Sequence, residues 1–187
     1  MSYLEQQFLV AMPDLDDPNF TRGVTLLAQH NDDGALGLVV NRPSNLHLSD
    51  LFEQMGLDHP DPTVADQVVF EGGPLHRERG LVLHETEASD PEWDSSLHVG
   101  QHLKITTSKD ILEAIAEGQG PARFMVALGY AGWEAGQLEQ EIRDNVWLNV
   151  DAQKDIVFDV PVEQRWARAV ATLGFSAEVL QPSGGHA

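Results

Sequence analysis

The sequence predicts a domain in which helices cover a mixed β-sheet. Short apolar runs follow one another directly in the first half of the chain, which favours antiparallel pairing of neighbouring strands. In the second half, strands alternate with helices, which favours some parallel pairing. The chain has 187 residues, of which 42% are hydrophobic, and this is enough for the core of one domain. We therefore expect one domain rather than two small ones.

The first strands are predicted from short apolar runs that end at turn residues. Residues 8–12 form a run that Pro13 ends, since proline has no N–H to donate to a sheet. Residues 24–28 and 36–40 flank a short polar turn at 31–34, so these two strands are expected to form a hairpin. Further strands are predicted at 68–70, 81–83, 103–106, 123–128, 146–148 and 156–158.

Three or four helices are predicted from apolar residues at helical spacing. Ser49 and Ser108 suit the position before a helix, because their hydroxyls accept hydrogen bonds from free N–H groups of the first turn. The helices are expected at 49–56, 108–118, 136–144 and 161–174. Residues 175–187 are expected to form a mobile tail.

The chain is strongly acidic, with 30 acidic and 11 basic residues and a formal net charge of −19. This charge favours solubility and opposes approach to phosphate backbones or anionic lipid. No basic stripe of the kind that nucleic-acid-binding domains carry is visible. The sequence therefore argues against direct nucleic-acid binding and against a membrane partner. A solvated surface is the simplest explanation of the acidity, and a specific cationic partner is the alternative.

The cellular location is predicted from what the sequence lacks. Residues 1–7 have neither the basic start nor the small-residue cleavage site of a signal peptide. The longest nearly apolar run, residues 124–133, is well short of the ~20 residues that a membrane helix needs. The absence of cysteine excludes disulfides, thiolate nucleophiles and cysteine-based metal sites. We expect a cytoplasmic protein.

The catalytic residues are unknown from sequence. No phosphate-binding loop, dinucleotide-binding glycine pattern or nucleophile elbow is present. His98 and His102 have the spacing of a helical metal site, but their neighbours favour a strand, and we expect both, with His84, to be surface histidines. Glu139 and Glu141 are two apart on a predicted helix and should face different ways.

We assign no metal and no cofactor. The alternative, a hydrolase or transferase assembled from carboxylates and histidines by the fold, stays open.

Three segments that follow apolar strands form the candidate ligand-binding site. If these strands run in the same direction, the segments would meet at one sheet edge, where open α/β sheets bind ligands. Arg42 would supply a planar cation, Tyr130 and Trp133 would supply flat walls, and the glycines would allow close approach to the backbone. The segments are Asn41-Arg42-Pro43, Gly72-Gly73-Pro74 and Gly129-Tyr130-Ala131-Gly132-Trp133. The alternative is that they are ordinary turns and core residues, with Arg42 paired internally.

Several motifs resemble those of the AlgH/YqgE family of bacterial proteins. They extend over about residues 8–174, nearly the whole chain. The motifs are Phe8-Leu9-Val10-Ala11-Met12-Pro13, Phe20 with Arg22 and Val24, the run from Gly34 to Pro43, Gly72-Gly73-Pro74 followed by the run from Arg79 to His84, Leu128 to Trp133, Gly136 to Glu139, Trp147-Leu148, and Phe158-Asp159 with Arg165-Trp166.

The resemblance implies one compact α+β domain over residues 1–174, with a bent and partly split sheet, in a bacterial cytoplasmic protein. It brings no established catalytic residues. The family's label of transcriptional regulator, taken with the acidic charge, favours indirect regulation. We therefore expect a non-enzymatic binding or regulatory protein whose partner is a protein or a small molecule.

Overall fold

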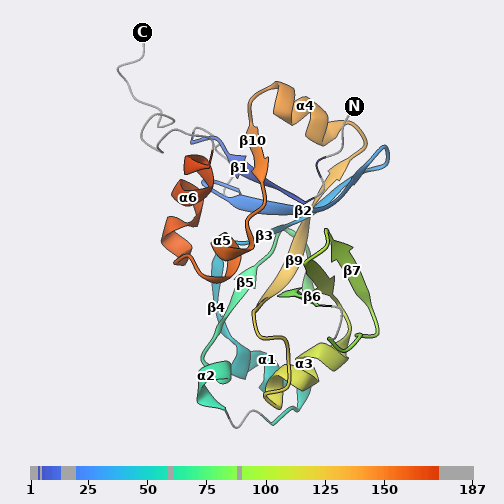
Figure 1. Cartoon of the computed structure of the whole chain (residues 1–187), viewed down its shortest axis with the longest axis vertical. Helices are drawn as coiled ribbons and strands as arrows, with labels where there is room; N and C mark the ends of the chain where they lie inside the picture. The colour runs from blue at the N-terminus through green and yellow to red at the C-terminus, as the bar shows by residue number, and fades with distance from the viewer. Residues whose placement is uncertain (1–3, 5, 14–19, 59–60, 88–89, 173–187) are drawn as a thin grey trace. The chain divides into compact units, whose positions relative to one another are not determined.

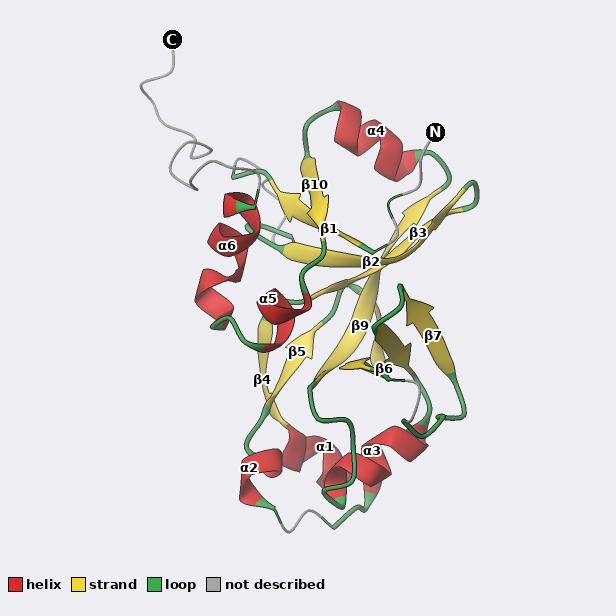
Figure 2. Ribbon diagram, in the orientation of Figure 1, coloured by secondary structure: helices red, strands yellow, loops and turns green. Residues whose placement is uncertain are grey.

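The computed structural model describes residues 4, 6–13, 20–58, 61–87 and 90–172. Contacts within the chain define two compact units, residues 1–42 with 131–187 (unit 1) and residues 43–130 (unit 2). Each unit combines strands with helices (Figures 1 and 2), which confirms the α+β class. A single domain over residues 1–174 stays a prediction. The predicted tail and the predicted helix end at Gly174 lie outside the described residues.

Unit 1 is built on an antiparallel sheet. Its strands are β1 (Gln7–Ala11), β2 (Val24–Asn31), β3 (Gly34–Val39), β10 (Trp147–Asp151) and the last residues of β9 (Phe124–Glu134). The strand order is β10-β1-β2-β3-β9. The β2–β3 hairpin is confirmed, with Asn31 opposite Gly34 at the turn. The inward faces of these strands give unit 1 its buried core.

Three helices accompany this sheet within the described part of unit 1. They are α4 (Gln137–Arg143), α5 (Lys154–Phe158) and α6 (Arg165–Ala171), the last preceded by a 3-10 turn at Val162–Gln164. The indole of Trp166 holds α6 to β1 by donating to the carbonyl of Ala11 at 2.9 Å. The predicted strand at 156–158 is wrong, since these residues lie in α5. A short apolar run fits a buried strand or one helical turn equally well, so its pattern cannot separate the two.

Unit 2 contains the mixed part of the sheet. Its strands are β4 (Pro43–His47), β5 (Val68–Glu71), β6 (Leu75–Glu85), β7 (Ser96–Val99), β8 (Leu103–Thr106) and the residues of β9 up to Tyr130. Strands β9, β6, β8 and β7 pair antiparallel in that order, whereas β5 runs parallel to β9 and antiparallel to β4. The prediction of a mixed sheet is therefore confirmed.

Helices α1 (Leu48–Met55), α2 (Pro62–Ala65) and α3 (Lys109–Ala116) complete unit 2. Ser108 precedes α3 as predicted, but α1 begins after His47 rather than after Ser49. Apolar side chains of α1 and α3 form one buried core with Val82 of β6. The described residues thus hold six α-helices, and the prediction of three or four missed the short helices α2 and α5. None of the described helices has the length and apolar composition to cross a lipid bilayer.

Candidate functional site

In unit 2, the predicted segment Gly72–Pro74 lies beside Gly129 and Tyr130, the first two residues of another predicted segment. The N–H of Gly72 donates to the carbonyl of Leu128 at 2.8 Å, and Leu75 pairs with Tyr130 in the sheet. Gly129 has φ of 78°, and a Cβ on it would lie 2.5 Å from the carbonyl oxygen of Gly73. Both the backbone conformation and the close approach therefore require glycine at 129.

Strand β6 has a four-residue bulge opposite Gly129. The register passes from Leu75 paired with Tyr130 to Gly80 paired with Leu128, so residues 76–79 have only Gly129 across from them. These four residues are exposed, and His76 has a positive φ of 47°. The imidazole of His76 stacks on the ring of Tyr130, with centroids 5.5 Å apart and 19° between the planes.

The bulge presents two arginines and one exposed apolar side chain. Arg77 and Arg79 flank Glu78, and Leu75 beside them is 42% exposed. Hydrogen bonds from the backbone N–H of Glu78 and from His76 lower the pKa of the Glu78 carboxyl, so this carboxylate stays ionised at neutral pH. We call Gly72–Pro74, Leu75–Arg79, Gly129 and Tyr130 the bulge surface. Sequence reasoning missed residues 75–79, although this polar run before the apolar strand 81–83 is a visible signal.

Asn41 and Arg42 hold a turn of unit 1. The side-chain oxygen of Asn41 accepts from the N–H of Val24 at 2.9 Å, and its amide nitrogen donates to the carbonyl of Arg22 at 3.0 Å. The guanidinium of Arg42 donates to the carbonyl of Thr21 at 2.9 Å. Arg42 is thus engaged with backbone in its own unit. Pro43 opens β4 in unit 2. The meeting of all three segments in one site stays a prediction.

The predicted turn at 129–133 is instead part of β9, which continues to Glu134. Side chains alternate along a strand, so Tyr130 and Gly132 share one face of it while Ala131 and Trp133 share the other. Trp133 is 6% exposed and packs edge-to-face with Trp147 in the core of unit 1, at 6.1 Å between centroids. Tyr130 and Trp133 therefore do not form two walls of one pocket.

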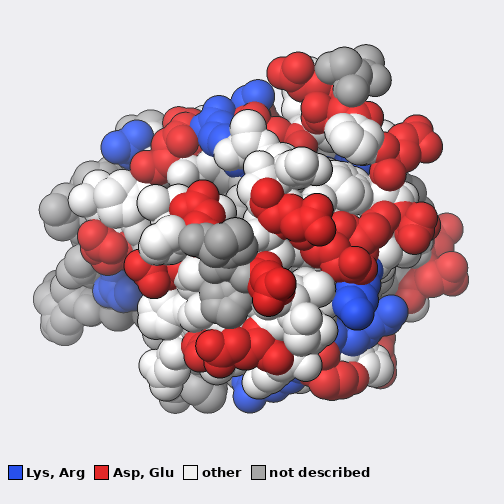
Figure 3. Space-filling model, turned by 90° about the horizontal axis from the view of Figure 1, so that it is seen from below, with Lys and Arg blue, Asp and Glu red and all other residues white. Residues whose placement is uncertain are grey.

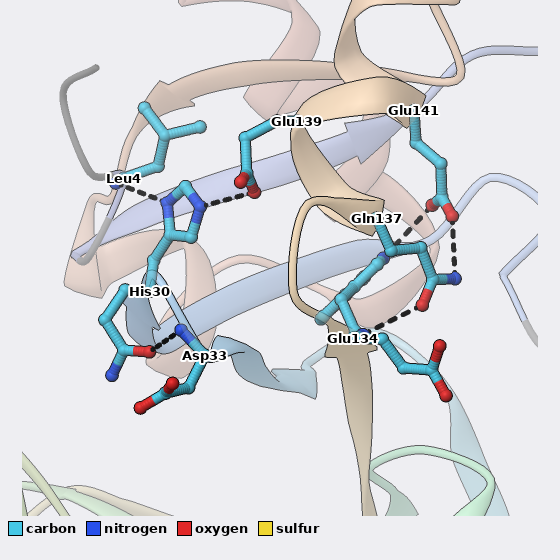
Figure 4. Close-up of polar contacts among 9 residues, drawn as sticks. Leu4, His30, Asp33, Glu134, Gln137, Glu139 and Glu141 are labelled. Atoms are coloured by element: carbon cyan, nitrogen blue, oxygen red, sulfur yellow. Dashed lines mark hydrogen bonds and ion pairs between the residues drawn. The ribbon is translucent and has the colours of Figure 1, made fainter.

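The polar contacts of α4 lie in unit 1 and are shown in Figure 4. The Nδ1 atom of His30 accepts from the N–H of Leu4 at 3.0 Å, and its Nε2 atom lies 2.8 Å from a carboxylate oxygen of Glu139. Because a backbone N–H can only donate, the neutral ring carries its proton on Nε2 and donates it to Glu139. This hydrogen bond lowers the pKa of the Glu139 carboxyl. The His30 ring is 1% exposed.

Glu141, two residues further on, binds two indoles. One of its oxygens accepts from Nε1 of Trp133 at 3.1 Å and of Trp147 at 2.9 Å, and the other accepts from the amide of Gln137 at 2.9 Å. As predicted, Glu139 and Glu141 engage different partners. The Glu141 carboxylate thus ties α4 to the aromatic core of unit 1.

His84 is a buried residue, and the prediction that it lies on the surface is wrong. The residue is 2% exposed. Its Nδ1 donates to the carbonyl of Glu85 at 2.9 Å, so Nε2 accepts from the hydroxyl of Thr106 at 2.8 Å. Burial lowers the pKa of His84, which keeps the ring neutral. His98 and His102 are exposed, and His98 lies on a strand.

The buried histidines give little support to the enzymatic alternative. Both ring nitrogens of His30 and both of His84 are occupied by the contacts above, so neither ring offers an open nitrogen to a substrate. Within the described residues, no three His, Asp or Glu side chains are grouped to hold a metal ion. Residues 75–79 of the bulge surface are exposed and therefore accessible to a ligand.

A family model described as AlgH-like matches residues 8–178 of this chain. The chain belongs to the AlgH-like family. Among its relatives, a UPF0301 protein of Ralstonia nicotianae is 50% identical over 184 residues, covering 98% of this chain and 95% of the relative. A UPF0301 protein of Methylococcus capsulatus is 48% identical over 184 residues, covering 98% and 96%.

The AlgH-like fold is also found in solved structures. The solution structure of the AlgH protein from Pseudomonas aeruginosa matches with a TM-score of 0.81 and 45% identity, covering 100% of this chain and 97% of that one. A crystal structure of a Corynebacterium diphtheriae protein matches with a TM-score of 0.71 at 20% identity, covering 92% and 88%. At that identity the second likeness concerns the fold alone.

Proposed function

We propose that this AlgH-like chain is a non-enzymatic binding protein that holds an anionic group of its ligand, a phosphate or a carboxylate, at the bulge surface. The observation that supports this proposal most strongly is the bulge itself. It holds two exposed arginines at positions 77 and 79, in a chain with only 11 basic residues.

The chemistry of the bulge surface suits a small anion. A guanidinium presents a planar set of donors that matches carboxylate and phosphate oxygens. The stacked rings of His76 and Tyr130 add a flat surface for an attached apolar or ring-shaped group. Gly73 is part-exposed and has no side chain that would keep a ligand from the backbone.

Local and overall charge together limit the class of ligand. The two arginines are partly offset by Glu78, so the bulge surface carries a net charge of about +1 when His76 is neutral. The whole chain carries −19, which repels a long polyanion such as nucleic acid. A small anionic molecule or a short acidic segment of a protein fits both facts. Regulation by this chain would then be indirect, through its ligand or partner, in the cytoplasm.

The experiment is an NMR titration of the ¹⁵N-labelled chain with a nucleotide, a sugar phosphate and a short acidic peptide. The proposal predicts that at least one of these shifts the backbone amides of Gly73, Arg79 and Tyr130 in a saturable way. A saturable shift of the backbone amide of Arg42 in the same titration would indicate that Asn41-Arg42-Pro43 also responds to the ligand. If none of the three probes moves the bulge surface, the proposal is wrong.

A pair of arginine variants provides the control. Arg79→Gln removes one charge at the bulge surface, and Arg143→Gln removes one from exposed α4 in unit 1. We expect Arg79→Gln to weaken binding about tenfold, since a hydrogen bond to a charged group contributes roughly 1.5–3 kcal/mol. Equal weakening by both variants would instead indicate a general charge effect.

A further inference from the structure

A concave site lies in unit 2, and none of its lining residues belongs to the bulge surface. It is a cavity of about 90 Å³ lined by His84, Asp90, Pro91, Trp93, Gln119, Gly120, Pro121 and Ala122. A water needs roughly 15 Å³ of such volume, so the cavity has room for a few waters or for the end of one side chain. It is too small for a nucleotide.

The walls of this cavity include one aromatic ring and a turn that packs closely on α3. Trp93 also packs against the buried core of unit 2. The N–H of Gln119 donates to the carbonyl of Ala114 at 2.8 Å, and a Cβ on Gly120 would lie 2.4 Å from Cγ1 of Ile115. The turn at 119–122 is therefore pressed against α3. Trp93 contributes an indole to the lining, and Pro91 and Pro121 contribute apolar rings.

The charge of the cavity is negative. Asp90 is its ionisable acid, and one oxygen of Asp90 accepts from the N–H of Glu87 at 2.7 Å, which leaves acceptor capacity on the carboxylate. His84 contributes a neutral ring, because burial lowers its pKa, and both of its nitrogens are engaged by Glu85 and Thr106.

The surroundings of the cavity are also acidic. Glu87, Glu92 and Asp94 on the same loop are exposed. Of the nearby cations, Arg123 is paired with Glu85 at 2.9 Å, and Lys104 acts electrostatically on His84. Figure 3 shows acidic side chains widespread on one face of the molecule, in keeping with the net charge of −19 of the whole chain. A cationic occupant would be attracted and an anionic one repelled.

We propose that this cavity binds the guanidinium of an arginine on a basic partner protein, stacked on Trp93 and hydrogen-bonded to Asp90. A guanidinium is planar and is attracted to the face of an indole, so it can stack on Trp93. Its paired donors suit a carboxylate acceptor. The site is independent of the bulge surface, so either proposal can fail without the other.

The test uses a capped five-residue peptide with arginine at its centre and glycine elsewhere. Its neutral counterpart carries citrulline in place of arginine. Binding is followed by the indole N–H signal of Trp93, which Trp93→Phe identifies among the four tryptophans. We expect the arginine peptide to shift this signal and the amide of Gly120, and the citrulline peptide to shift neither. Equal shifts by both peptides, or none at Trp93, would overturn the proposal.

Two loop variants separate the cavity from general charge. Asp90→Asn and Glu92→Gln each remove one negative charge from the same loop, but only Asp90 lines the cavity. Asparagine keeps an oxygen to accept from Glu87. We expect Asp90→Asn to raise the dissociation constant of the arginine peptide about tenfold and Glu92→Gln to change it less than twofold. Equal effects of the two variants would contradict a specific site.

Discussion

Replacing Gly129 with alanine should disrupt the bulge surface, and a second glycine of unit 2 provides a matched comparison. Gly129 has φ of 78° and Gly118 has φ of 79°. A Cβ at 129 would lie 2.5 Å from the carbonyl oxygen of Gly73 and 2.9 Å from that of Leu75, whereas a Cβ at 118 has no atom within 4 Å. The two alanine variants therefore share the backbone strain and differ in the collision.

The expected magnitudes follow from these two contributions. A left-handed conformation costs a non-glycine residue about 1–2 kcal/mol, which both variants should show. In Gly129→Ala the new methyl group also collides with two backbone oxygens. This collision should lower the stability by a further ~1–3 kcal/mol, the usual effect of overpacking. Gly118→Ala should thus lower the free energy of unfolding by about 1–2 kcal/mol, and Gly129→Ala by about 2–5 kcal/mol.

Urea denaturation measures this difference directly. The midpoints should separate while the slopes stay equal, because the surface exposed on unfolding does not change. In Gly129→Ala, the amide hydrogen of Gly72, which is bonded to Leu128, should also exchange faster with solvent. If the two variants are destabilised equally, the close packing of Gly73 and Leu75 on Gly129 is refuted. The conformation of the bulge surface described above, which depends on that packing, would then also be wrong.

Two further predictions concern buried polar groups. Glu141→Ala should lower the free energy of unfolding by about 2–4 kcal/mol, because the indole N–H groups of Trp133 and Trp147 lose a charged acceptor. Glu141→Gln should lower it less, because the amide oxygen can still accept a hydrogen bond. Equal losses for the two variants in urea denaturation would contradict the role of Glu141 as acceptor. The pKa of His84 is lowered by burial in the folded chain. Below about pH 6.5 the unfolded chain therefore binds a proton that the folded chain does not, so the free energy of unfolding should decrease as the pH is lowered through this range. The variant His84→Gln should reduce this dependence of the unfolding free energy on pH, whereas His98→Gln, which replaces an exposed residue, should not. An unchanged pH dependence in His84→Gln would contradict the buried, neutral state of His84.

The parts of the fold that the sequence predicted are those fixed by local pattern. The β2–β3 hairpin follows from two apolar runs around a polar turn, and α3 follows from Ser108 and apolar residues at helical spacing. Both signals lie within about ten residues of the structure that they specify. Helix α5 was missed because its apolar residues are too few to show a helical period.

The candidate site was predictable only in part, because it depends on contacts between distant segments. Gly72–Pro74 and Gly129 of unit 2 could be found, since glycine marks close approach of backbones. The bulge at 76–79 depends on the register of β6 against β9, which no local pattern fixes. The burial of His84 was missed for a related reason: alternation shows which residues share a face, but not which face is covered.

The most direct test of the proposed function is the affinity of the bulge surface for the anion that shifts it most strongly in the NMR titration. Calorimetry would compare the wild-type chain with the double variant Arg77→Gln, Arg79→Gln at two salt concentrations. We expect the double variant to raise the dissociation constant at least tenfold, and we expect added salt to weaken binding to the wild type more than to the variant. Equal dissociation constants for the two proteins would show that the anion binds elsewhere and would contradict the proposed function.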